Sequence, residues 1–212
     1  MKTYFNVTRA IALQKYLSKK VILNDRYDKI SRIVAVDSSF IGSNKIIAVA
    51  GVFEYPSLNM IEYKYIVDDV KIPYIPGLLA FREAPFYIKL LSKMMFDIIL
   101  VDGHGVAHPR FLGIAAHVGV VLNKPSIGVA KKKLYGDIRV LRNKMIIVDP
   151  KSNKIIGSIL KSRGKNLYVS PGHRISVESA TLFVKSLLRN YYLPLPLHIV
   201  DKLTKELKKK YR

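Results

Sequence analysis

The stretch that decides the fold is FDIILVDGHGVAHPRFLGIAAHVGVVLNKPSIGVAKK, residues 96–132. It begins with an apolar run that ends at Asp102, and it closes with a second short apolar run, "PSIGVAKK". Between the two lies "RFLGIAAHVGVVLN", which is apolar and long enough for a helix. A strand, a helix and a strand in this order predict two parallel strands joined by a crossover helix. This stretch therefore predicts an α/β fold.

Three apolar segments upstream predict three consecutive strands. "RIVAVDSSF" predicts a strand over 33–36 that ends at Asp37, and "KIIAVAGVFEY" is apolar on both faces, as in a strand covered on both sides. "MIEYKYIVDDV" alternates between apolar and polar residues, which is typical of a half-buried strand. We expect an antiparallel meander that opens a mixed sheet.

The remaining segments predict helices around this sheet. One helix is expected over 7–19, and another from about Pro85, in its first turn, to Met95. A hairpin follows over 144–160, then the strand "NLYVSPGHR", a helix capped by Ser176 and a helix ending in "KELKKKYR". The chain, residues 1–212, thus reads as a single α/β domain with a mixed central sheet flanked by helices.

The charge balance points to an anionic partner. The chain carries 36 Lys and Arg against 15 Asp and Glu, a formal net charge of +21. Nucleic acid is the simplest partner for such an excess, and a solvated lysine coat is the alternative. The absence of cysteine excludes disulfides and thiolate zinc sites. No apolar run reaches the roughly 18 residues of a membrane span, so we expect a cytoplasmic protein without membrane contact.

Three carboxylates occupy places where catalytic groups gather. Asp37 and Asp102 are expected at the ends of strands, and Glu83 just before a helix. Each one alone would ordinarily be a turn or capping residue. Together, on a basic chain, they favour an oxygen-ligand site for Mg²⁺ or Mn²⁺ and metal-dependent phosphodiester chemistry.

Histidines in the same region leave a zinc site open as the alternative. His104, His108 and His117 all lie within residues 101–119. His104 follows the glycine after Asp102 and reads as a loop residue. His117 lies in an apolar helix and reads as a hydrogen-bonded core residue.

Five segments, taken in order, resemble the endonuclease V family. They are "AVDSSF", "PYIPGLLAFRE", "VDGHGVAHPRFLGIAAHVG", "SIGVAKKKL" and "SPGHRIS", and the likeness runs from about Ile33 to Asp201. The resemblance implies a ribonuclease H-like fold and a nuclease directed at deoxyinosine. It also implies Asp37, Glu83 and Asp102 as the catalytic, metal-binding carboxylates. Mg²⁺ would be the cofactor, with Mn²⁺ as a substitute.

The resemblance extends to residues beside the carboxylates. His108 matches the histidine next to the scissile phosphate, and Lys131 matches an active-site lysine. A solvated lysine remains the alternative for Lys131. Asp201 falls at the family's late acidic position and is a candidate fourth metal contributor or a capping residue. His198 departs from the family pattern, because an arginine is expected there.

Recognition of the lesion is also implied by the resemblance. Tyr74, between two prolines, matches a wedge that fills the gap left by a displaced base. A packed loop residue is the alternative. Arg82 would contact phosphate or hold Glu83 in place. The residues implied in DNA or lesion binding are Tyr74, Pro76, Gly77, Leu79, Arg82, Gly103, Leu134 and His173.

The expected function is a DNA repair endonuclease. It would nick DNA at the second phosphodiester bond 3′ to deoxyinosine, leaving a 3′-hydroxyl and a 5′-phosphate, and act as a monomer. An inosine-specific ribonuclease or a junction nuclease on the same fold is the alternative, with inosine-containing RNA as a second partner. A non-catalytic binding module is disfavoured, because nucleic-acid binding gains nothing from clustered acids.

Overall fold

A computed structural model describes residues 5–212, and its strands form one sheet. The sequence expectations that include residues 1–4 lie, for those four, outside the described residues. In chain order the elements are α1 (Val7–Ser18), β1 (Arg32–Ile41), β2 (Lys45–Glu54), β3 (Met60–Asp69), α2 (Ala80–Leu91), β4 (Ile98–Asp102), α3 (Ile114–Leu122), β5 (Ser126–Ala130), β6 (Asp137–Leu141), β7 (Lys144–Val148), β8 (Ile155–Ser162), β9 (Lys165–His173), α4 (Val177–Ser186) and α5 (Leu195–Lys210).

The sheet has the predicted mixed topology. Its strands lie in the order β3-β2-β1-β4-β5-β9-β8-β7-β6. β1, β4 and β5 are parallel, and α3 is the crossover between β4 and β5. The outer strands pair antiparallel, including the expected meander of β1, β2 and β3. Three parallel strands therefore occupy the middle of the sheet, where their carboxyl ends open on one edge.

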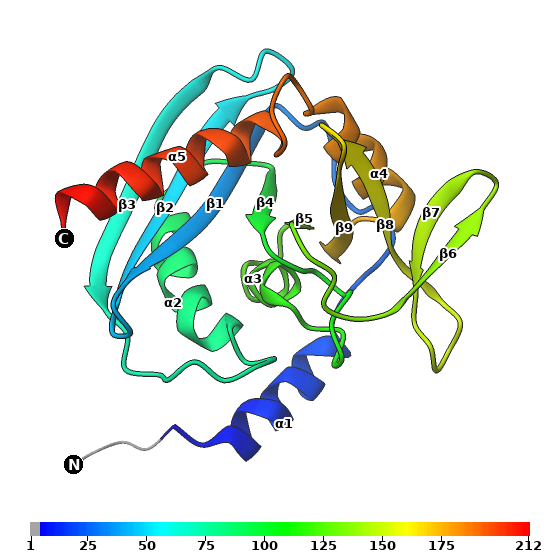
Figure 1. The fold of residues 1–212 in the computed structure, drawn as a ribbon, viewed down its shortest axis with the longest axis horizontal. Coiled ribbons are helices and arrows are strands. Elements are labelled where there is room, and N and C mark those ends of the chain that lie inside the picture. Colours follow the sequence, from blue (N-terminus) through cyan, green and yellow to red (C-terminus); the bar gives the residue numbers. More distant parts are fainter. Residues whose placement is uncertain (1–4) are drawn as a thin grey trace.

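Helices cover both faces of the sheet. In Figure 1, α5 crosses one face of β1 and β2, while α2 lies on the other face. Side chains of β1 alternate between two apolar cores: Ile33 and Ala35 pack with Val200 of α5, and Val34 and Val36 pack with residues of α2. The same alternation turns the next odd-numbered side chain, that of Asp37, toward α5.

Two expected boundaries are wrong, and both concern catalytic candidates. β1 does not end at Asp37 but continues to Ile41, because β2 pairs with it along its whole length. Glu83 does not precede its helix but lies in the first turn of α2, which begins at Ala80 instead of Pro85. Proline was expected at the start because its missing N–H is harmless there. Here Pro85 is tolerated inside the helix.

Further comparisons concern β6, α3 and α4. β6 was not predicted, because every residue of this edge strand is exposed and its apolar residues carry no burial pattern. α3 begins at Ile114, so residues 103–113 form a loop after β4. The expected cap of α4 is confirmed, since the Ser176 side chain accepts a hydrogen bond from the Ser179 backbone N–H at 3.1 Å. Among the helices of residues 5–212, none combines the length and apolar character that a membrane crossing requires.

Candidate active site

Strand register brings the first catalytic candidates side by side. Val36 of β1 pairs with Val101 of the parallel strand β4, so Asp37 and Asp102 follow at the same level. Asp102 in turn pairs with Val129 of β5, and Lys131 lies two residues further on. Because side chains alternate along a strand, all three point to the face that α5 covers. The site is therefore built at the carboxyl ends of three parallel strands.

A third carboxylate reaches this cluster from α5. Asp201 follows Val200, which packs in the core between α5 and the sheet. Oxygen atoms of Asp37, Asp102 and Asp201 all lie within 4.8 Å of one another. Asp201, inferred from the sequence only as a candidate fourth contributor, thus belongs to the central group.

Glu83 approaches from the opposite layer. Ser38 follows Asp37 on β1, and its hydroxyl donates a hydrogen bond to Glu83 Oε1 at 3.0 Å. Glu83 is buried in the first turn of α2 and is not a member of the three-aspartate group. The charges of Asp37 and Asp102 nevertheless act on the Glu83 carboxyl. Glu83 therefore lies next to the three-aspartate group, and Ser38 of β1 holds its carboxylate.

Burial and mutual repulsion make the carboxylates hard to ionise. Burial, followed by the charge of Asp102, raises the pKa of Asp37 to about 7. Burial also raises the pKa of Glu83 to about 8, with Asp37 adding to the effect. The pKa of Asp102 is raised by burial despite the opposing charge of Lys131. A cation between these groups would stabilise their charged forms.

Two lysines supply positive charge in the structure. Lys131 Nζ lies 2.6 Å from Asp102 Oδ2 and 3.1 Å from Asp201 Oδ1. Lys205, one turn after Asp201 on α5, lies 2.5 Å from Asp201 Oδ2. Burial tends to raise the pKa of Asp201, but the hydrogen bonds and charges of both lysines hold it below its usual value. Burial likewise tends to lower the pKa of Lys131, and Asp102 and Asp201 outweigh that effect and raise it.

The donor set fits a hard divalent cation. The three clustered groups offer carboxylate oxygens only, which suit Mg²⁺ or Mn²⁺ better than zinc. None of the histidines among residues 5–212 belongs to this group. His104 contacts the Lys132 carbonyl at 3.0 Å, and His117 packs edge-on against Phe81. The residues present can hold such a metal.

His108 is buried and neutral beside the loop that carries Tyr74. Its Nδ1 accepts a hydrogen bond from the Arg110 backbone N–H at 3.1 Å, and its Nε2 lies 3.2 Å from the Gly77 carbonyl oxygen. Since Nδ1 accepts, the proton resides on Nε2. Burial, assisted by the charge of Arg110, lowers the pKa of His108 to about 4.

The lesion candidates divide into exposed and buried residues. Tyr74 is 65% exposed in the loop between β3 and α2, and Leu79 and Leu134 are also exposed. Pro76 lies exposed in the same loop. Gly103 directly follows Asp102, with so little space that a Cβ there would lie 2.6 Å from Ile114 Cγ2.

Arg82 and His173, both candidates for DNA binding, are buried and therefore do not form part of an exposed DNA-binding surface. Arg82 is buried, donates to the Ser43 carbonyl at 2.9 Å and lies over the Phe40 ring. Its charge lowers the pKa of Glu83 against the effect of burial, which agrees with a supporting role. His173 is buried at the end of β9, where it pairs with Ser126 at the start of β5, the opposite end of that strand from the catalytic edge.

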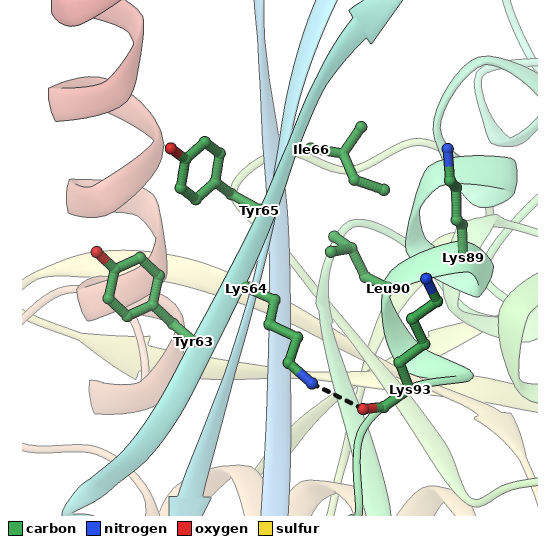
Figure 2. A pocket seen from close by; sticks show the side chains of 7 residues that line it. All are labelled: Tyr63, Lys64, Tyr65, Ile66, Lys89, Leu90 and Lys93. Atoms are coloured by element: carbon green, nitrogen blue, oxygen red, sulfur yellow. Dashed lines mark hydrogen bonds between the residues drawn. The ribbon is translucent and has the colours of Figure 1, made fainter.

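A separate hollow of about 600 Å³ lies between β3 and α2. Figure 2 shows Ile66, Leu90 and Lys89 around it, with the Lys64 ammonium donating to the Lys93 carbonyl at 2.8 Å. Tyr63 and Tyr65 project from the other side of β3. No carboxylate of the candidate site lines this hollow, which is therefore distinct from it.

Three supporting residues were missed in the sequence. Ser38 holds Glu83, and Lys205 holds Asp201. The single Thr204 hydroxyl proton lies between two acceptors, the Asp201 carbonyl at 2.8 Å and Asp37 Oδ2 at 3.4 Å. The helical spacing from Asp201 to Thr204 and Lys205 could have placed these on one face. Ser38 could have been found from its position next to Asp37.

Comparison with known proteins agrees with this geometry. The family model described as endonuclease V matches residues 15–202. An endonuclease V from Desulfurococcus amylolyticus is 40% identical over 207 residues, covering 93% of each chain. The crystal structure of the catalytic domain of human endonuclease V superimposes with a TM-score of 0.89 at 27% identity, covering 97% of this chain and 96% of that chain.

One further structure contains nucleic acid. A variant of Ciona intestinalis endonuclease V, crystallised with a 23mer DNA containing an inosine followed by a ribo-adenosine, has a TM-score of 0.86 at 25% identity. It covers 97% of this chain and 98% of that chain.

The fold and the carboxylate cluster define a nuclease of the ribonuclease H-like class, a hydrolase that cleaves DNA. Within that class, the chain belongs to the endonuclease V family.

Proposed function

We propose that this chain is a Mg²⁺-dependent endonuclease that nicks DNA at the second phosphodiester bond 3′ to deoxyinosine, leaving a 3′-hydroxyl and a 5′-phosphate. Asp37, Asp102 and Asp201, gathered within 4.8 Å at the edge of the sheet, are the observation that carries the proposal. The inosine-containing DNA bound by the Ciona intestinalis protein supports deoxyinosine as the lesion. Mn²⁺ is the expected substitute.

The carboxylates are the proposed metal ligands. Asp37 and Asp102 would hold the metal from the sheet, Asp201 from α5, and Glu83 from α2. When bound, the metal supplies a more acidic water and charge stabilisation for the oxygens of the phosphate. The hydrogen bond from Ser38 fixes the orientation of Glu83, so the ligands are held before substrate arrives.

Lys131 is the proposed cation beside the scissile phosphate. It contacts Asp102 directly, so its ammonium lies at the edge of the carboxylate group. Negative charge on the phosphoryl oxygens grows during attack, and a fixed cation there stabilises it. His108, proposed to lie beside the phosphate, is neutral, and its Nε2 proton is directed at the Gly77 carbonyl oxygen.

Tyr74 is the proposed wedge. An exposed aromatic side chain can fill the gap of a displaced base, at a cost of a few kcal/mol for unstacking. The pocket for the base is proposed to include Gly77, Leu79, Gly103 and Leu134, with Pro76 stiffening the loop. The proposed enzyme acts as a monomer in the cytoplasm.

A nicking assay with matched substrates tests the proposal. End-labelled deoxyinosine duplex, undamaged duplex, inosine-containing RNA and a four-way junction would be incubated with Mg²⁺ or with EDTA. We expect Mg²⁺-dependent nicking of the deoxyinosine duplex well above the other three. Preferential cleavage of the RNA or the junction would show that the protein is a ribonuclease or a junction nuclease instead. Binding without cleavage of any substrate would show that it is not a nuclease.

A further inference from the structure

The loop that carries Tyr74 accepts hydrogen bonds from distant residues at one atom. This wedge loop, residues 73–78, turns through a hydrogen bond from the Leu78 N–H to the Ile75 carbonyl at 2.9 Å, and the Leu78 side chain is buried. Within residues 5–212, its only hydrogen-bond acceptor for distant residues is the Gly77 carbonyl oxygen. The polar contacts that fix the exposed part of the loop therefore converge on that oxygen.

Three side chains converge on this oxygen. Arg110 Nη2 donates at 2.6 Å, Gln14 Nε2 donates at 3.0 Å, and His108 Nε2 lies at 3.2 Å. A carbonyl oxygen has two lone pairs, so three donors saturate its capacity to accept hydrogen bonds. A bond from a charged guanidinium is stronger than one between neutral groups.

Gln14 also holds Arg110. Its Oε1 accepts from Arg110 Nε at 2.5 Å, while its amide lies 3.4 Å from the Leu112 carbonyl. Gln14 is fully buried although its neighbour Leu13 on α1 is 42% exposed. A glutamine at this depth requires hydrogen-bond partners, and these contacts supply them. The helix α1 therefore faces the protein through Gln14.

The glycine is matched to this arrangement. Gly77 has φ +76°, a left-handed conformation that other residues rarely adopt. A Cβ at this position would lie 2.6 Å from Arg110 Nη2. Glycine therefore suits both the left-handed backbone and the close approach of the guanidinium, which a side chain here would displace.

We propose that Gln14 and Arg110 are positioning residues for lesion recognition, fixing the wedge loop through the Gly77 carbonyl so that Tyr74 is presented in one orientation. We call the contacts of Gln14 and Arg110 with the Gly77 carbonyl the clamp. The role of the clamp in lesion recognition rests on the proposed function, whereas its effect on the loop does not. α1 thereby takes part in substrate selection, although Gln14 lies just before residues 15–202 matched by the family. A stiff loop loses less conformational entropy when Tyr74 enters the duplex.

Single and double substitutions test the clamp. Gln14→Met and Arg110→Met each remove polar contacts while keeping an unbranched side chain. The ratio of kcat/KM for deoxyinosine duplex over undamaged duplex should fall about tenfold in each, the effect of losing one charge-assisted hydrogen bond. The double variant should lose little more than either single one, because both residues act on the same oxygen.

Ser158→Ala is the matched stability control. It removes a buried hydrogen bond of 2.7 Å to Thr181, between β8 and α4. The ratio of kcat/KM for deoxyinosine duplex over undamaged duplex should equal that of the wild type. This should hold even if the melting temperature of Ser158→Ala falls as far as that of the Gln14 and Arg110 variants. Equal losses of discrimination in the control and the clamp variants would overturn the positioning role.

Amide hydrogen exchange separates this inference from the proposed function. Exchange at the Leu78 N–H, which donates to the Ile75 carbonyl within the loop, should accelerate at least about tenfold in Gln14→Met and remain unchanged in Ser158→Ala. Unchanged exchange in Gln14→Met would overturn the clamp, whatever the substrate. A wild-type enzyme without preference for deoxyinosine would instead refute the proposed function, while the exchange result would still decide the clamp.

Discussion

Lys131 Nζ lies 2.6 Å from Asp102 Oδ2, so the cation at the edge of the sheet contacts a proposed metal ligand directly. The contact arises from register, since β5 and β4 are parallel and Lys131 follows Val129, the partner of Asp102, by two residues. The ammonium would therefore compete with a bound metal for the same carboxylate oxygens. In the proposed reaction, a metal held by those oxygens would leave the positive charge of Lys131 for the phosphate.

Lys131→Met should slow nicking about 10²–10³-fold, because it removes a fixed cation from the developing charge. It should also lower the Mg²⁺ concentration at half-maximal rate, since the competing ammonium is gone. A Mg²⁺ titration of the single-turnover rate measures both. Lys132→Met, which changes the next residue in the run, should behave as the wild type. An undiminished rate in Lys131→Met would place the lysine outside the reaction.

Asp201→Asn should weaken Mg²⁺ binding about tenfold, since one of the three clustered carboxylate charges is lost. Glu206→Gln on the same helix is the control, because Glu206 is exposed and, among residues 5–212, its one ion-pair partner is Lys202 at 3.8 Å. Calorimetric titration of Mg²⁺ into each protein gives the affinities. Equal Mg²⁺ affinities in Asp201→Asn and Glu206→Gln would show that Asp201 is a capping residue and not a metal ligand.

The metal-free protein should lose stability as the pH rises above about 6.5. The pKa of Asp37 is raised to about 7 and that of Glu83 to about 8, so these two groups bind more protons in the folded state than in the unfolded state up to roughly pH 8. Below about pH 6.5 the histidines whose pKa values are lowered to about 4, including His108, act in the opposite direction. The free energy of unfolding therefore falls between about pH 6.5 and 8. The stabilisation by Mg²⁺ should grow over the same window, because the metal binds the deprotonated carboxylates.

Melting curves at pH 6 and pH 8.5, with and without Mg²⁺, measure this effect. Asp37→Asn combined with Glu83→Gln should flatten the pH dependence. A Mg²⁺-induced shift that is larger at pH 6 than at pH 8.5 would contradict the assignment of these carboxylates as ligands.

Tyr74→Ala should reduce discrimination between deoxyinosine and undamaged duplex about 10–100-fold, the equivalent of losing a base-sized stacking contact. Binding to undamaged DNA, measured across a salt series, should change little because it depends on phosphate contacts. Tyr63→Ala is the matched control, as Tyr63 is 45% exposed on β3 and does not belong to the wedge loop. Parallel losses of discrimination and general binding would refute a wedge.

The sequence predicted the part of the site that depends on strand order. Asp37 and Asp102 were expected near the carboxyl ends of neighbouring strands, and the parallel pairing of β1 with β4 places them side by side. It could not place Asp201, because nothing in the local pattern tells which face of the sheet a C-terminal helix will cross. The edge strand β6 was missed for a related reason, since an exposed strand has no burial pattern to read.

The clamp on Gly77 was equally hidden from the sequence. Gln14 contacts an oxygen 63 residues away, and its burial depends on where α1 docks. Glu83 was identified as a catalytic candidate, but its place inside α2 was not, because Pro85 suggested a later start. Residues on one strand or helix can be aligned by periodicity, whereas contacts between layers require the packed structure.

The central claim is that the clustered carboxylates drive metal-dependent nicking at deoxyinosine. Its most direct measurement is the single-turnover nicking rate of an end-labelled deoxyinosine duplex with Mg²⁺, comparing Asp102→Asn with Asp97→Asn. Asp97 lies just before the other end of β4, where it accepts backbone hydrogen bonds from Ser31 and Arg32 at 2.7 and 2.9 Å. We expect a loss of about 10³-fold or more for Asp102→Asn, a wild-type rate for Asp97→Asn, and a nick at the second phosphodiester bond 3′ to the lesion. Full Mg²⁺-dependent nicking by Asp102→Asn would contradict the account.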